Sequence, residues 1–220
     1  MNTSRKNRPG DPPRSLLLVH GAGSGPWIFE GWASAFPGIA VSAIDLQENL
    51  EVETASMTSY AAVVRSAAQR LNPPVALCGW SMGGLTVLHV APVVKPHSVI
   101  LLEPSPPAEV QGFYPETPLA LGAFDPEEVY GPSAPGERSR PESLLARSER
   151  KRGISVPALP CPSLVVYGDT LPPERGPRVA AFYGSEEAHF PGLSHWDLVL
   201  EPGVRIAIAR YLGVQVESLP

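Results

Sequence analysis

The sequence contains little cysteine, and this shortage limits the class of protein it encodes. Only two cysteines occur, Cys78 and Cys161, too few for the disulfide framework of a small secreted domain. Both stand in apolar, strand-like surroundings, where a free thiol behaves as a small hydrophobic side chain. We therefore expect a reducing, cytoplasmic environment.

Basic charge and long apolar runs are also scarce. The chain carries 17 Lys and Arg against 22 Asp and Glu, for a net charge of −5, and so lacks the excess of positive charge typical of nucleic-acid-binding proteins. Its longest apolar runs, such as 98-SVILLEP-104, are far shorter than the ~20 residues of a membrane-spanning helix. Neither a nucleic acid nor a membrane is expected as a partner.

Patterns of metal ligands are missing as well. The five histidines are not spaced with Cys, Asp or Glu as metal-binding motifs require. We predict no metal site, and the chemistry considered below requires no cofactor.

Apolar runs of strand length alternate with segments of helical periodicity. The runs are almost continuously apolar, as expected for strands that are buried on both faces, and their alternation with helices is typical of a parallel sheet covered by helices on both faces. The expected strands are 15–20, 39–45, 75–80, 98–103, 163–168 and 186–191. The expected helices are 27–36, 58–71, 82–91, 173–184 and 197–212.

One proline-rich segment interrupts this alternation. The chain has 27 prolines, well above the usual ~5%, and many lie in the segment 105–156, where no strand pattern occurs. We expect this segment to be a lid or binding loop inserted in one domain spanning 15–214, with a disordered insertion as the alternative. A flexible basic tail (1–14) and a short tail (215–220) flank the domain.

The lid contains one charged stretch with helical character, 140-RPESLLARSERKR-152. Its basic run, 147–152, is interpreted as a solvated helix face rather than an anion site.

The motif 79-GWSMG-83 presents a candidate nucleophile. Glycines on both sides of Ser81 allow a sharp strand-to-helix turn that exposes its hydroxyl. A serine becomes a nucleophile when an imidazole accepts its proton and a carboxylate orients that imidazole. His195 follows the last expected strand, and Glu103 and Asp169 each follow another. Because the carboxyl ends of parallel strands share one edge of a sheet, these residues are expected to gather there.

The glycine-rich turn 19-VHGAGSGPW-27 follows the first expected strand. The backbone N–H groups of Ala22, in this turn, and of Met82, after the serine, are candidate donors to an oxyanion. Trp27 and Trp196 adjoin the motifs and are expected to line an apolar substrate pocket, whereas Trp80 is expected in the core. His20 is expected to support the turn.

The order of HG turn, GxSxG motif, acid and histidine resembles that of the α/β-hydrolase superfamily, from Leu16 to Leu212. HGAGSGPW is similar to the opening motif of plant methylesterases and hydroxynitrile lyases. The resemblance implies an α/β-hydrolase fold and serine hydrolase chemistry. Family members usually carry two further strands before the HG turn, whereas only fourteen residues precede Ser15 here, so a mostly parallel sheet of about six strands is expected.

The acid departs from the family pattern. Members commonly place an aspartate in a Gly-x-x-Asp pattern after the next-to-last strand, and 167-YGDTLPPERG-176 has Leu171 at that position. Asp169 fills the role if the loop is shortened. Some members, such as haloalkane dehalogenases, place the acid one strand earlier, where Glu103 stands. We favour Asp169, with Glu103 as the alternative.

The sequence thus predicts a serine hydrolase that acts on a small carboxylic ester or thioester through an acyl-enzyme on Ser81. The displaced acid motivates one alternative, a non-catalytic or weakly catalytic ligand-binding member of the fold. A second alternative is a hydroxynitrile-lyase-like activity, although the resemblance implies a lysine beside the histidine, where this chain has Trp196.

Overall fold

The computed structural model describes residues 9–134 and 136–215. Most of the predicted basic tail (1–8) and most of the predicted C-terminal tail (216–220) lie outside the described residues. The rest of the predicted N-terminal tail contacts the body of the protein. The backbone N–H of Arg14 donates to the backbone oxygen of Pro74 at 2.9 Å, and the Arg14 oxygen accepts from Ala40 at 2.9 Å. Arg14 thus extends the pairing of the first strand.

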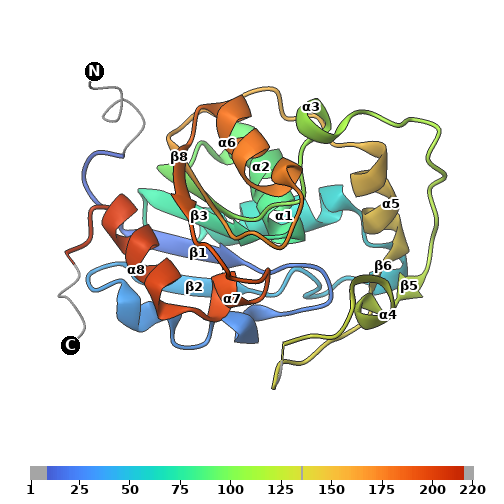
Figure 1. Cartoon of the computed structure of the whole chain (residues 1–220), viewed down its shortest axis with the longest axis horizontal. Helices are drawn as coiled ribbons and strands as arrows, with labels where there is room; N and C mark the ends of the chain where they lie inside the picture. Colours follow the sequence, from blue (N-terminus) through green and yellow to red (C-terminus); the bar gives the residue numbers. More distant parts are fainter. Residues whose placement is uncertain (1–8, 135, 216–220) are drawn as a thin grey trace.

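A six-stranded sheet forms the centre of the protein (Figure 1). Its order is β2-β1-β3-β4-β7-β8, and every neighbouring pair is parallel. The α/β prediction with about six parallel strands is therefore confirmed. The strands are β1 (Ser15–Val19), β2 (Ala40–Ile44), β3 (Val75–Trp80), β4 (Ser98–Leu102), β7 (Ser163–Tyr167) and β8 (Glu186–His189).

Burial differs between the centre and the edges of this sheet. The central strands β1, β3 and β4 are buried along their whole length, as their continuous apolar runs predict. The edge strands β2 and β8 are only partly buried. The expectation of burial on both faces is thus wrong for the edges, because an edge strand has a sheet neighbour on one side only.

Helices cover both faces of the sheet, as predicted (Figure 1). Alternate strand residues divide the core in two: Leu17 and Leu77 pack with one set of helices, and Leu18 and Cys78 with the other. The first layer holds α1 (Met57–Gln69), α2 (Met82–Val94) and α6 (Pro177–Tyr183). The second holds two short 3-10 helices, η1 (Pro26–Phe29) and η2 (Trp32–Ala35), with α7 (Asp197–Leu200) and α8 (Pro202–Tyr211).

The predicted helix 27–36 is therefore two 3-10 helices, separated where Gly31 adopts a left-handed conformation. The predicted helix 197–212 is likewise divided, because Pro202 begins a new helix. The predicted helix 173–184 becomes η4 (Pro173–Arg175) followed by α6. A further 3-10 turn is η3 (Val52–Thr54).

The proline-rich segment 105–156 folds as a small subdomain at one end of the sheet (Figure 1). The expectation that it lacks strands is wrong, since two residues pair with two others in an antiparallel ladder. Its elements are α3 (Ala108–Gln111), β5 (Ala123–Phe124), α4 (Pro126–Tyr130), β6 (Glu142–Ser143) and α5 (Leu144–Arg152). The sequence had predicted only α5, which carries its N-cap: the Ser143 hydroxyl accepts from Ala146 N–H at 3.2 Å.

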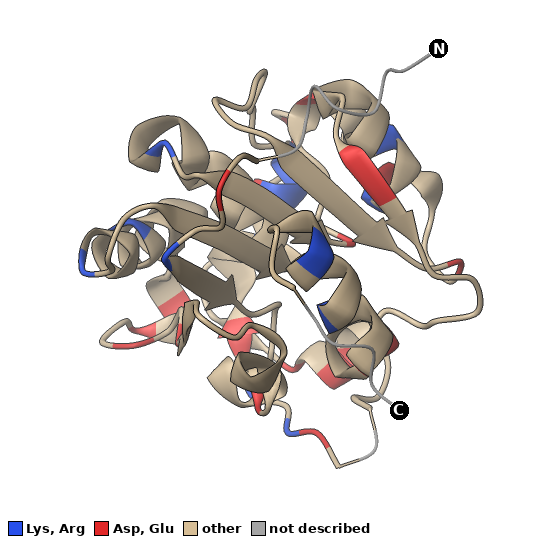
Figure 2. Cartoon of the chain, turned by 90° about the vertical axis from the view of Figure 1, so that its left-hand side faces the viewer, with Lys and Arg blue, Asp and Glu red and all other residues tan. Residues whose placement is uncertain are grey.

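Charge is distributed evenly on the side of the molecule near the termini, where acidic and basic residues are interspersed (Figure 2). Among the described residues, no helix is long and apolar enough to cross a membrane.

Candidate active site

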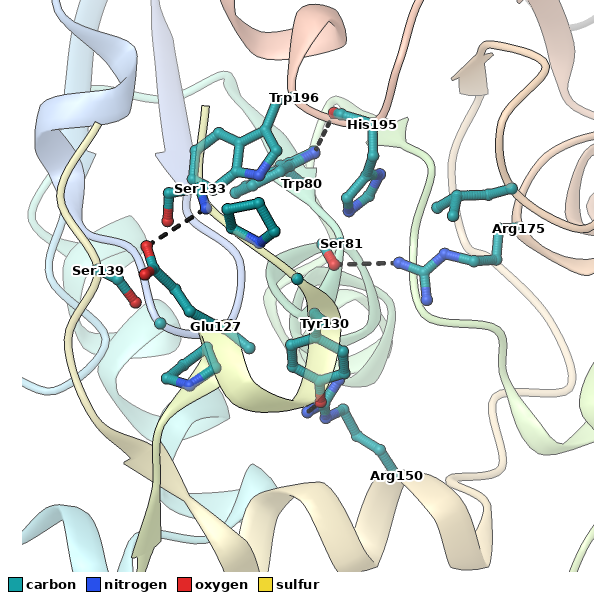
Figure 3. Close-up of a pocket in the computed structure, with 16 residues that line it drawn as sticks. Trp80, Ser81, Glu127, Tyr130, Ser133, Ser139, Arg150, Arg175, His195 and Trp196 are labelled. Atoms are coloured by element: carbon teal, nitrogen blue, oxygen red, sulfur yellow. Dashed lines mark hydrogen bonds between the residues drawn. The ribbon is translucent and has the colours of Figure 1, made fainter. Parts of the chain in front are cut away.

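Ser81 lies at the turn between β3 and α2, at the carboxyl end of the sheet. Its backbone has φ 55° and ψ −119°, a strained conformation for a residue with a side chain. The hydroxyl lines a cavity of about 270 Å³ that lies between the sheet and the lid (Figure 3). The GxSxG pattern thus forms the expected strand-to-helix turn, and its half-buried serine faces the cavity.

Backbone segments approach each other closely around the Ser81 turn, and only glycine fits at the positions two residues before and after the serine. A Cβ atom on Gly83 would lie 2.3 Å from the backbone oxygens of Val19 and His20. A Cβ on Gly79 would lie 2.4 Å from the Gly83 oxygen. Both positions therefore exclude any larger residue, because backbone atoms cannot move away as a flexible side chain can.

His195 and Glu103 form a hydrogen-bonded pair beside Ser81. His195 Nδ1 lies 2.7 Å from Glu103 Oε2, so the assigned tautomer donates from Nδ1 and leaves Nε2 free to accept a proton. The other Glu103 oxygen accepts from Gly168 N–H at 2.8 Å. The Glu103 side chain is only 2% exposed, so its carboxylate is held by two donors in a water-poor site.

Asp169, the acid favoured from the sequence, does not contact His195, and that prediction is corrected. Its Oδ1 lies 2.6 Å from Nε2 of His189, and its Oδ2 accepts from Gly192 N–H at 2.9 Å. The Asp169 side chain is 51% exposed. Asp169 follows β7, and its side chain points to the neighbouring strand β8. Glu103, at the end of the central strand β4, reaches His195 instead.

The protonation of His195 depends on its surroundings. Burial lowers the pKa of His195 below its ordinary value, and the positive charge of Arg175 lowers it further. The Glu103 carboxylate acts in the opposite direction. The net effect favours the neutral imidazole, which is the form that can accept a proton from a serine.

Arg175 is the hydrogen-bond partner of Ser81, which the sequence did not predict. Arg175 Nη2 donates to Ser81 Oγ at 3.0 Å and to the backbone oxygen of Glu103 at 2.9 Å (Figure 3). In the described part of the chain, the Ser81 hydroxyl is not hydrogen-bonded to His195, although both residues line the cavity. The Arg175 contact occupies a lone pair of Ser81 Oγ and leaves its O–H free to donate, so proton transfer requires the hydroxyl to move within hydrogen-bond distance of His195.

The two expected oxyanion donors are the N–H groups of Met82, the residue after Ser81, and of Ala22 in the glycine-rich turn. Met82 begins α2, so its N–H has no acceptor within the helix. Ala22 lines the cavity, and within the described residues neither N–H group donates a backbone hydrogen bond. Both groups are thus available to a developing oxyanion.

Buried polar residues hold the loop that contains Ala22. His20 donates from Nδ1 to the Gly21 oxygen at 2.8 Å and accepts at Nε2 from Leu46 N–H at 3.0 Å, which agrees with the predicted structural role. Glu142, from the lid, is fully buried and accepts from Gly23 N–H at 3.2 Å. The lid and the glycine-rich turn are therefore joined through a buried carboxylate.

The two tryptophans expected in the pocket differ in position. Trp196 lines the cavity and packs against Trp80, with ring centroids 4.7 Å apart. Trp27 is not among the lining residues; instead its ring packs against the guanidinium groups of Arg138 and Arg140, so that prediction is corrected. Trp80, expected in the core, is 2% exposed but also borders the cavity.

The lid supplies lining residues that the sequence did not identify. Tyr130, on α4, and Arg150, on α5, both face the cavity with Ser81 (Figure 3). The interpretation of 147–152 as a solvated face is therefore wrong for Arg150. Leu171, at the position where the family pattern places an aspartate, also lines the cavity. Helical periodicity alone could not show that Arg150 faces this cavity while its neighbour Lys151 is exposed.

A metal centre finds no support among the described residues, since no cluster of three His, Cys, Asp or Glu side chains could hold an ion. The chemistry available to the cavity is that of a hydroxyl, an imidazole and its carboxylate, with two backbone N–H donors and two guanidinium groups nearby.

Comparison with known proteins places this arrangement in a family. The model of the alpha/beta hydrolase family matches residues 16–211. A curated relative, a pimeloyl-[acyl-carrier protein] methyl ester esterase of Neisseria meningitidis serogroup A, is 31% identical over 88 residues. The match covers 40% of this chain but only 28% of that relative.

Two solved structures show the same fold. The thioesterase RedJ from the prodiginine pathway of Streptomyces coelicolor is 21% identical, with a TM-score of 0.60 over 90% of this chain and 85% of that chain. A methylesterase from Arabidopsis is 18% identical, with a TM-score of 0.65 over 90% of this chain and 98% of that chain. Because the family model matches nearly the whole domain, the chain belongs to the alpha/beta hydrolase family.

Proposed function

We propose that this protein is a serine hydrolase that cleaves a small carboxylic ester or thioester through an acyl-enzyme on Ser81. The observation that carries the proposal is the hydrogen-bonded pair of His195 and Glu103 beside a serine held on a strained turn. The curated relative and the structural neighbours, named as an esterase, a thioesterase and a methylesterase, support this class of substrate.

In the proposed first step, Ser81 Oγ attacks the carbonyl carbon while its proton passes to His195 Nε2. Glu103 orients the imidazole and stabilises the imidazolium. The carbonyl oxygen gains negative charge and accepts hydrogen bonds from the N–H groups of Ala22 and Met82. Each such donor contributes about 3 kcal/mol to transition-state stabilisation in comparable enzymes.

When the tetrahedral intermediate collapses, the bond to the alcohol or thiol breaks, and His195 returns its proton to that leaving group. A water molecule then attacks the acyl-enzyme, with His195 again as the base, and the acid product leaves Ser81 free. The cycle consumes one water and requires no cofactor. The absence of a cofactor and a cytoplasmic location stay predictions.

The test is the hydrolysis of p-nitrophenyl esters of increasing acyl length, and of the matching N-acetylcysteamine thioesters. Wild-type protein should turn over one series, and Ser81→Ala should not. A fluorophosphonate probe should label wild-type protein but not Ser81→Ala. Hydrolysis that persists undiminished in Ser81→Ala would contradict the assignment of the nucleophile.

A second candidate is a non-catalytic or weakly catalytic binding protein, and one observation favours it. The Ser81 hydroxyl accepts from Arg175 rather than donating to His195. If the Ser81 hydroxyl keeps this position in solution, it does not reach His195 and the serine is not activated. Wild-type protein would then resist the fluorophosphonate while still binding carboxylic acids or esters, which separates the two candidates.

A further inference from the structure

A second cavity, of about 180 Å³, adjoins the one that contains Ser81. Three residues border both cavities: Tyr130, Arg150 and Arg175. The smaller cavity is also lined by Arg147 and Lys151, so four of its lining residues are cationic and none is acidic. Such a concentration of one charge is unusual in a chain whose net charge is −5.

The arginines of this cavity lack the partners that buried guanidinium groups usually have. Neither Arg150 nor Arg175 forms a salt bridge with a carboxylate of the described residues. Arg147, Arg150 and Arg175 each carry a buried Nε–H that finds no acceptor in the part of the chain that the structure describes. Buried donors without acceptors are rare in folded proteins and indicate that a partner is missing.

The nearby carboxylates are occupied elsewhere. Glu103 binds His195 and Gly168 N–H. Glu149, which precedes Arg150, accepts from Met57 N–H at 2.6 Å, and Glu127 accepts from Ser133 N–H at 3.3 Å. The Glu103 carboxylate offsets the charge of Arg175 only in part, and none of these three acids forms a salt bridge with the arginines of the cavity.

The two shared arginines also repel each other. Burial and the positive charge of Arg150 lower the pKa of Arg175 to about 10, so Arg175 remains charged at neutral pH. Among the described residues, the Arg150 side chain donates only to neutral oxygens, those of Ser105 at 3.3 Å and Tyr130 at 3.2 Å. An anion between them would relieve the repulsion and form charge-assisted hydrogen bonds.

We propose that the cavity around Arg150 and Arg175 is an anion-binding subsite for a carboxylate or phosphate group carried by the substrate. The inference rests on the proposed hydrolysis at Ser81 and narrows its substrate to esters or thioesters with an acidic group. The guanidinium forks suit both oxyanions. The anion would also offer Arg175 a charged acceptor in place of the neutral Ser81 hydroxyl.

The kinetic test compares two esters of similar length, p-nitrophenyl hydrogen glutarate and p-nitrophenyl valerate. Wild-type protein should prefer the acidic ester in kcat/KM. In Arg150→Gln this preference should fall by about tenfold or more, because a charge-assisted hydrogen bond is lost. Arg150→Lys retains the positive charge but lacks the planar guanidinium group, so it should keep part of the preference for the acidic ester. Arg65→Gln, at an exposed arginine on α1, is the matched control and should keep all of it.

A binding test distinguishes the kind of anion and does not depend on hydrolysis. Glutarate, inorganic phosphate and neutral glutaramide are titrated into wild-type protein and Arg150→Gln by calorimetry. Binding of glutarate alone, or of phosphate alone, identifies the group, and in either case binding should weaken in Arg150→Gln.

The outcomes separate the subsite from the proposed function. If wild-type protein hydrolyses both esters equally and binds neither anion, the subsite is overturned while hydrolysis at Ser81 stands. If the anions bind through Arg150 but no ester is cleaved, hydrolysis fails while the anion site stands. Equal anion binding by wild-type protein and Arg150→Gln also overturns the subsite.

Discussion

Arg175 Nη2 lies 3.0 Å from Ser81 Oγ and 2.9 Å from the backbone oxygen of Glu103. One guanidinium group therefore joins the ends of the two central strands that carry the proposed nucleophile and the proposed acid. Its charge also lowers the pKa of His195. Arg175 can thus influence each member of the proposed triad without taking part in proton transfer itself.

The choice of acid is open to a direct kinetic comparison. Glu103→Gln removes the charge that orients His195, and kcat should fall by about a hundredfold to ten-thousandfold. Asp169→Asn changes an exposed residue paired with His189 and should leave kcat close to the wild-type value. Thermal unfolding of both variants controls for folding. The reverse order of effects would restore Asp169 as the acid.

The pH dependence of kcat/KM should reflect the environment of His195. Only neutral His195 can accept the Ser81 proton, and burial and Arg175 lower its pKa below 6.5. Activity should therefore persist as pH falls through 6.5, with an acid limb below that value. A limb at or above the ordinary histidine value would contradict the assigned environment.

Removal of the Arg175 charge should shift this acid limb. In Arg175→Met the imidazolium is no longer repelled, so the pKa of His195 rises and the limb moves to higher pH. Arg178→Met is the control, because this arginine is exposed and pairs with Glu174. The acid limb of the pH profile should not move in this control. An unchanged acid limb in Arg175→Met would show that the Arg175 charge has no effect on the pKa of His195.

Close packing behind the nucleophile predicts a stability difference between two helix glycines. Gly83→Ala places a Cβ 2.3 Å from two backbone oxygens and should lower the free energy of unfolding by about 1–3 kcal/mol or more. Gly203→Ala, in the first turn of α8, meets its nearest atom at 3.6 Å and should leave stability unchanged or slightly increased. Urea denaturation of both variants measures the difference, and equal stabilities would contradict the close approach.

The buried carboxylate of Glu142 should couple the lid to the glycine-rich turn. It accepts from Gly23 N–H and from the Tyr60 hydroxyl, so Glu142→Ala leaves both donors buried without an acceptor. The free energy of unfolding should fall by about 1–3 kcal/mol, and kcat should fall because Ala22 lies in the loosened turn. The exposed substitution Glu48→Ala is the control. Unchanged stability of Glu142→Ala in urea denaturation would contradict this role.

Local sequence patterns were sufficient to locate the strands of the main sheet and the helical segments that cover it, but not most elements of the lid. Continuous apolar runs located the inner strands β1, β3, β4 and β7, because burial on both faces leaves few polar positions in an inner strand. The edge strand β8, with two glutamates and a histidine, has no such run. The helix boundaries were less accurate where Gly31 and Pro202 divide a periodic segment. Two-residue strands such as β5 and β6 carry too few residues to show any period.

Ser81 and its turn could be predicted from sequence because the elbow depends on neighbours within a few residues. The partner of His195 could not, since Glu103 and Asp169 both follow strands, and only the position of each strand in the sheet decides which carboxylate reaches the imidazole. Trp27 and Arg150 were misassigned for the same reason. The direction of a side chain from a loop or helix is set by packing against distant residues, so the tertiary structure alone brings Arg150 and Arg175 to one cavity.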